Sequence, residues 1–130
     1  MASRKEEAMN PSDVPLQEEG GLEYALRVLR VLGPRGGVPR DAKTIGALPR
    51  ILVQGMELAD REYDRLLSSI DPEYYHEFAV PTHIEIDEST AEDLRSSLEM
   101  RQEFPGVLGP ESIHHEGKVY KVWIQVFPCG

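Results

Sequence analysis

The sequence of 130 residues has a single cysteine, a single tryptophan and no long run of apolar residues. Cys129 alone cannot form an internal disulfide or supply a cysteine-rich metal site. No stretch approaches the roughly 20 apolar residues that a membrane-spanning helix needs. The first residues also lack the apolar core of a signal peptide. These absences predict a cytoplasmic protein that does not contact a membrane.

Basic residues are scarce as well. The chain has 14 lysines and arginines against 23 aspartates and glutamates, which gives a net charge of −9. This balance excludes a protein that coats DNA or an anionic membrane over its whole surface. The apolar fraction is 40%, as in ordinary folded domains. We expect one domain over residues 20–130, preceded by a flexible acidic tail over residues 1–19.

Two segments in the first half have the apolar periodicity of a helix. Apolar side chains recur three and four positions apart in residues 21–32, and again from Leu52 to Ile70 with charges at the remaining positions. This spacing predicts helices over about 21–32 and 50–70. The intervening stretch is rich in glycine and proline, and a short helix is expected to begin after Asp41.

The last third combines strands with one helix. Residues 82–87 alternate between apolar and polar, as in a half-buried strand. The sequence Ser-Thr-Ala-Glu at residues 89–92 matches a capping box, which predicts a helix over about 90–104. Prolines and glycines over residues 105–110 indicate a loop.

Residues 111–127 have the pattern of a β-hairpin. Glu116-Gly117 is a suitable two-residue turn, and it predicts that His114 faces Val119 and that Ile113 faces Tyr120. The fold class is therefore α+β. We expect N-terminal helices packed with a small, mainly antiparallel sheet of about three strands and the further helix over 90–104.

Positive charge is concentrated in one part of the chain. Residues 27–50 contain six basic residues and one acidic residue. Gly36-Gly37 lets backbone N–H groups approach an anion, and Arg35, Arg40 and Lys43 lie close by in sequence. The segment is interpreted as a contact for an acidic or nucleic-acid partner. A small-molecule phosphate site and pairing with the chain's own carboxylates are the alternatives.

Aromatic residues form the second candidate group. Tyr74 and Tyr75 are interrupted by charged neighbours, and Trp123 lies on the less apolar face of the last strand. Such side chains dominate the energetics of protein interfaces. We predict that Arg35, Arg40, Lys43, Tyr74, Tyr75 and Trp123 bind a partner. The alternative is that helices cover both faces of the sheet and bury the aromatic side chains.

Catalytic and metal signals are weak. His83 and Glu85 share one face of a predicted strand, and His114 across the sheet would complete a two-histidine, one-carboxylate cluster. No motif names a reaction, so we predict no catalytic residues, no bound metal and no cofactor. A small metal-dependent enzyme is retained as an alternative.

The sequence therefore favours a non-catalytic regulator or adaptor that binds a protein partner, as part of a transcription or defence complex that handles nucleic acid. The main alternative is a winged-helix regulator that contacts nucleic acid through residues 27–50, with the hairpin as its wing. Acidic residues on the 50–70 helix oppose this alternative, because a phosphate backbone would repel them.

Overall fold

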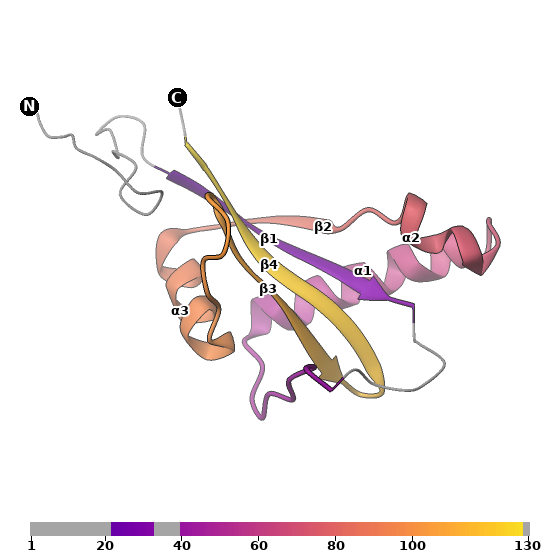
Figure 1. Cartoon of the computed structure of the whole chain (residues 1–130), viewed down its shortest axis with the longest axis horizontal. Helices are drawn as coiled ribbons and strands as arrows, with labels where there is room; N and C mark the ends of the chain where they lie inside the picture. The colour runs from indigo at the N-terminus through magenta and orange to yellow at the C-terminus, as the bar shows by residue number, and fades with distance from the viewer. Residues whose placement is uncertain (1–21, 33–39, 129–130) are drawn as a thin grey trace, which may run out of the picture.

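The computed structural model describes residues 22–32 and 40–128 of the chain. Helices cover one face of an antiparallel sheet in this part of the molecule (Figure 1). The elements, in chain order, are β1 (Leu22–Val31), α1 (Arg50–Leu67), η2 (Pro72–Tyr74), α2 (Tyr75–Phe78), β2 (Thr82–Ile86), α3 (Glu88–Leu98), β3 (Val107–His115) and β4 (Lys118–Pro128). The predicted tail over residues 1–19 lies outside the described residues.

The sheet has four strands in the order β2-β1-β4-β3, one more than predicted. All three neighbouring pairs are antiparallel. Both α1 and α3 pack against β1 from the same side, which is the far side of the sheet in Figure 1. The α+β class is confirmed, with the helices in one layer and the sheet in the other.

The segment predicted as a helix over residues 21–32 is the strand β1, so that prediction was wrong. β1 is a central strand, paired with β2 on one side and β4 on the other. Leu26 and Val28 face the helices, while Ala25 is buried on the opposite face. A central strand with apolar residues on both faces lacks strict alternation, and its apolar positions then match helical spacing by coincidence.

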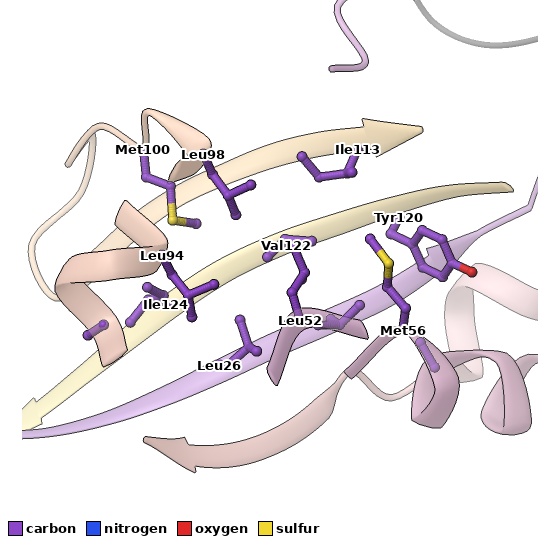
Figure 2. Packing of buried hydrophobic residues seen from close by; sticks show 13 residues of the cluster. Leu26, Leu52, Met56, Leu94, Leu98, Met100, Ile113, Tyr120, Val122 and Ile124 are labelled. Carbon is purple, nitrogen blue, oxygen red and sulfur yellow. The ribbon is translucent and has the colours of Figure 1, made fainter. Parts of the chain in front are cut away.

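The apolar core fills the space between the sheet and the two long helices. Figure 2 shows side chains from three strands meeting those of α1 and α3. The largest fully buried members of this cluster are Tyr120, Leu26, Leu52, Leu94, Leu98, Ile113, Ile124, Val28 and Val122. These residues lie on the helix side of the sheet, so this core is a single apolar layer between the sheet and the two helices.

The predicted hairpin is confirmed in its turn and its register. His114 pairs with Val119 and Ile113 with Tyr120. Glu116 and Gly117 have φ angles of 52° and 77°, as a type I′ turn requires at both central positions. The turn sequence alone therefore set which side chains of β3 and β4 face each other.

The helix predicted over 50–70 is confirmed as α1, although it ends at Leu67. The helix predicted over 90–104 is α3, which begins at Glu88 and ends at Leu98. The predicted capping box is not used, because the carboxylate of Asp87 accepts the N–H of Thr90 at 2.7 Å instead.

Two further predictions were wrong, a loop over residues 105–110 and a short helix after Asp41, and both segments border the sheet edge at β3. Residues 107–110 belong to β3, which is bulged between Leu108 and Glu111. Gly109 lies in this bulge with a φ of 94°, which a side chain would disfavour. No short helix begins directly after Asp41, and the next described helix is α1, which begins at Arg50. Lys43 forms a parallel bridge to Ile113 there instead.

Candidate functional site

The structure does not gather the six predicted partner-binding residues into one site. Arg35 lies outside the described residues. Arg40 and Tyr74 are exposed, but they belong to a turn before α1 and to η2. The remaining three residues, Lys43, Tyr75 and Trp123, lie in three different surroundings.

Lys43 is engaged within the chain. Its ammonium group lies 2.9 Å from a carboxylate oxygen of Glu111 and donates to the carbonyl of Leu98 at 2.7 Å. Its backbone also borders β3. These contacts tie the segment around Lys43 to the sheet edge. The contacts support the alternative in which basic residues pair with the chain's own acids.

Tyr75 is fully buried rather than exposed. Its hydroxyl donates to the backbone carbonyl of Arg30 at 2.6 Å, and its ring meets that of Tyr63 edge-on at 5.1 Å. Burial, with a smaller contribution from Tyr63, raises the pKa of Tyr75 to about 12. A phenol held neutral in this way anchors α2 to β1 and is not available to a partner.

A polar cluster at the middle of α1 binds that helix to the sheet. We call Arg30, Asp60, Lys118 and Tyr120 the Asp60 cluster. The Asp60 carboxylate lies 2.9 Å from the Arg30 guanidinium and 3.3 Å from the Lys118 ammonium. Tyr120 donates to the same carboxylate. Burial and this carboxylate raise the pKa of Tyr120, so its phenol does not act as a base near neutral pH.

Two basic residues of the segment 27–50 form ion pairs within the chain. Arg30 is neutralised by Asp60, and its guanidinium lies 3.9 Å from the ring centroid of Tyr63. Lys43 is neutralised by Glu111. The described basic residues of this segment therefore do not converge into one positive surface.

Trp123 belongs to the side of the sheet that faces away from α1 and α3. We call this side the open sheet face. The register places Arg27 of β1 between His83 of β2 and Trp123 of β4. Gln125 and Phe127 follow on the same face, since side chains alternate along β4. No described helix packs on these side chains (Figure 1).

Arg27 is held in place at the centre of the open sheet face. Its Nε donates to the carbonyl of Thr82 at 3.0 Å, and its Nη1 donates to Oε1 of Gln125 at 2.7 Å. The guanidinium carbon lies 6.0 Å from the ring centroid of Trp123, at the outer limit of a cation–π contact. These contacts fix the guanidinium while part of it stays accessible.

The rings of His83 and Phe127 extend the aromatic surface beyond Arg27. Their centroids are 6.2 Å apart, and the planes are tilted by 33°. Trp123 and Phe127 are both half-buried, whereas His83 is exposed. The open sheet face thus presents a fixed cation between aromatic rings. The residue type and the alternation of β4 predicted Trp123, but Arg27 was missed because its segment was assigned to a helix.

The histidine–carboxylate cluster that belongs to the metal-dependent alternative does not form. His83 and Glu85 lie on β2, and His114 lies on β3, which is the opposite edge of the sheet. Nor do residues 22–32 and 40–128 contain any group of three histidine, cysteine, aspartate or glutamate side chains arranged to hold a metal ion. The geometry therefore gives no support to the metal-dependent alternative.

The helix-turn-helix arrangement was also wrong, because the segment expected as its first helix is β1. A surface hollow of about 600 Å³ beside β3 is lined by three basic and four acidic side chains: Lys43, Arg101, Lys121, Asp41, Glu99, Glu103 and Glu111. Its mixed charge does not favour a phosphate group. Within the described helices, none has both the length and the apolar character needed to span a bilayer.

Comparisons with known proteins found no matching family model, no matching curated protein and no matching solved structure.

Proposed function

We propose that this protein is a non-catalytic adaptor or regulator that binds a protein partner through the open sheet face. The observation that carries the proposal is the position of Trp123. This large aromatic residue lies half-buried on a sheet face that no described helix covers, beside a guanidinium fixed by two hydrogen bonds. Anchors of this kind contribute most of the binding energy in protein interfaces.

The chemistry of the face favours a partner segment that combines an apolar side chain with an acceptor group. Trp123 and Phe127 offer apolar ring surface, and Arg27 offers N–H donors to a carboxylate or a carbonyl. Because Arg27 is already oriented by Thr82 and Gln125, little conformational entropy is lost when it binds.

Charge on this face favours a protein over a nucleic acid. The strand register places two basic residues, Arg27 and Lys121, and two acidic residues, Glu23 and Glu85, on the open sheet face. A balanced face on a chain of net charge −9 attracts phosphate groups weakly. Membership of a transcription or defence complex then depends on the partner rather than on direct contact with nucleic acid.

The test is capture of partners from the source cells with the tagged full chain, compared with Trp123→Ala and Arg27→Gln variants. Phe78→Ala is a matched control, because it removes an exposed aromatic ring outside the open sheet face. We expect a stoichiometric protein partner with the wild type and the control, and its loss with both face variants. Thermal unfolding verifies that each variant is folded.

Trp123 also provides a direct readout, since it is the single tryptophan of the chain. Purified partner should shift or quench its fluorescence at the same concentrations that saturate capture. Binding that survives Trp123→Ala would contradict the proposal. So would the absence of any stoichiometric protein partner, or the finding that labelled single-stranded RNA or DNA binds the face instead.

A further inference from the structure

The two edges of the sheet differ in whether another segment of the chain pairs with them. At the β3 edge, Lys43 donates its backbone N–H to Ser112 and accepts that of His114, both at 2.7 Å. These bonds cover part of the edge. At the β2 edge, no segment within residues 22–32 and 40–128 pairs with the outer side of the strand. An uncovered strand edge is a template for pairing with another strand.

The backbone groups that point outward from β2 can be identified. The N–H and the carbonyl of Val28 both lie 3.3 Å from the hydroxyl of Thr82, so both groups of Val28 face β2. Directions alternate along antiparallel strands. Thr82, Ile84 and Ile86 therefore turn their backbone groups toward β1, while His83 and Glu85 turn theirs toward the outer edge.

We propose that two copies of this chain associate through antiparallel pairing of β2 with β2, with the twofold axis at Ile84. The outward backbone groups of His83 then pair with those of Glu85 in the second copy, and the reverse pair forms on the other side of the axis. The two sheets become one sheet of eight strands. This inference goes beyond the proposed function and does not depend on it.

The side chains on β2 favour this register over the two registers centred one residue away. Centred on Ile84, the pairing sets an imidazole opposite a carboxylate twice, and an imidazole N–H can donate to a carboxylate in either protonation state. A register centred on Glu85 would set two carboxylates opposite each other, and one centred on His83 would set two imidazoles together. Opposite-charge cross-strand pairs stabilise a sheet, and like-charge pairs destabilise it.

The residues flanking β2 are complementary in the same register. Pairing centred on Ile84 places Asp87 and Glu88 of the second copy opposite Pro81 and Val80. A hollow of about 360 Å³ beside this segment is lined by two arginines, Arg61 and Arg65, and by one acid, Glu62. The acidic start of α3 in one copy therefore approaches a surface with a positive balance in the other.

Apolar side chains beside the edge support the same arrangement. Leu58 and Val80 are large apolar residues with 38% and 59% of their surface exposed, and both line this hollow. A twofold axis perpendicular to the sheet keeps both helix layers on one side and brings the two α1 helices together. Association then removes Leu58 from water in both copies.

The charge pair is tested by sedimentation equilibrium between about 5 and 500 µM. We expect a reversible dimer of the wild type. Glu85→Lys and His83→Glu should each weaken dimerisation at least about tenfold. Glu85→Lys replaces the carboxylate acceptor of each imidazole with an ammonium group, and His83→Glu sets two carboxylates opposite each other twice. The double variant His83→Glu/Glu85→Lys restores opposite charges and should return the dissociation constant to within about threefold of the wild type. Glu103→Lys is the matched control, since it reverses an exposed charge beside β3, at the opposite edge of the sheet.

The register is tested by disulfide formation, with Cys129→Ser in every protein. A mixture of the His83→Cys and Glu85→Cys chains should form a crosslinked heterodimer, while each variant alone should crosslink poorly. If the wild type stays monomeric throughout the concentration range, the proposal is overturned, and the β2 edge is then a candidate for pairing with a strand of another protein. A dimer that ignores the charge reversals, or crosslinks better within one variant, would overturn it as well.

Discussion

The phenol of Tyr120 donates to both oxygens of the Asp60 carboxylate, at 2.9 and 3.2 Å, across a separation of 60 residues. The contact joins the middle of α1 to β4 at the end of the apolar core. The ring of Tyr120 belongs to that core, and its hydroxyl points out of it (Figure 2). One side chain thus serves both the apolar layer and the polar cluster beside it.

Asp60 should therefore matter more to stability than other acids of α1. Asp60→Ala leaves Arg30, Lys118 and Tyr120 without their shared acceptor, and we expect it to lower the free energy of unfolding by about 2 kcal/mol. The measurement is urea denaturation followed by circular dichroism. Asp64→Ala is the control on the same helix and should change stability by less than about 0.5 kcal/mol. Equal effects of the two variants would contradict a stabilising role for the cluster.

Stability should fall in alkali because of the buried phenols. The pKa of Tyr75 is raised to about 12 in the folded chain, whereas an unfolded tyrosine titrates near 10. The folded state therefore keeps its proton longer than the unfolded state. The stabilisation is fully present below about pH 10 and is lost as pH rises from about 10 to 12.

Denaturant titrations between pH 8 and 12 measure this decline. Tyr75→Phe should be less stable near neutral pH, because it lacks the hydrogen bond to Arg30, but its stability should decline less between pH 10 and 12. A decline as steep as that of the wild type would show that Tyr75 is not responsible.

Gly55 should resist substitution even though alanine is the better helix former. It is buried on α1 against β1, and a Cβ atom there would lie 2.7 Å from Cγ2 of Val28. Valine has little rotameric freedom to move aside. We expect Gly55→Ala to lower the free energy of unfolding by about 1–2 kcal/mol, because overpacking outweighs the gain in helix propensity.

Gly46→Ala is the control for that substitution, since a Cβ atom at Gly46 meets nothing within 4 Å. Thermal unfolding should show a lower midpoint for Gly55→Ala and little change for Gly46→Ala. A stabilised Gly55→Ala variant would contradict the close packing of α1 on β1.

The start of α3 offers a direct choice between two candidate caps. The sequence favours a capping box from Ser89 to Glu92, but the Asp87 carboxylate accepts the N–H of Thr90. Hydrogen bonds from the Thr90 side chain, and to a smaller extent from its backbone N–H, lower the pKa of Asp87. Their contribution to stability is therefore present above the usual aspartate pKa and is lost as the solution is acidified. We expect Asp87→Ala to lower the melting temperature at pH 7, and Ser89→Ala to leave it nearly unchanged. The reverse order would favour the capping box.

Much of the fold was predictable wherever local signals were sufficient. The charged and apolar faces of residues 50–70 specified α1, and Glu116-Gly117 specified the hairpin and its register. The alternation of residues 82–87 specified β2, with Ile84 and Ile86 packed against the core. In these segments the pattern of one element is enough, because each has one buried face and one exposed face.

The candidate site was harder to predict. Trp123 was found from its residue type and its place in an alternating strand. Arg27 was not, because its neighbours resemble a helix, and its role depends on Thr82 and Gln125, which lie 55 and 98 residues away. Tyr75 was predicted to bind a partner, but its burial depends on the packing of α2 against β1, which local sequence does not encode.

The sequence by itself determined α1, β2, the hairpin turn and the acidic balance of the chain, because these depend on neighbouring residues and on composition. Only the tertiary structure decided that residues 22–31 form a central strand, that Lys43 and Arg30 are paired with Glu111 and Asp60, and that Trp123 shares a face with Arg27. Strand pairing and ion pairing between distant segments decide these features. A periodicity confined to ten residues carries no information about either.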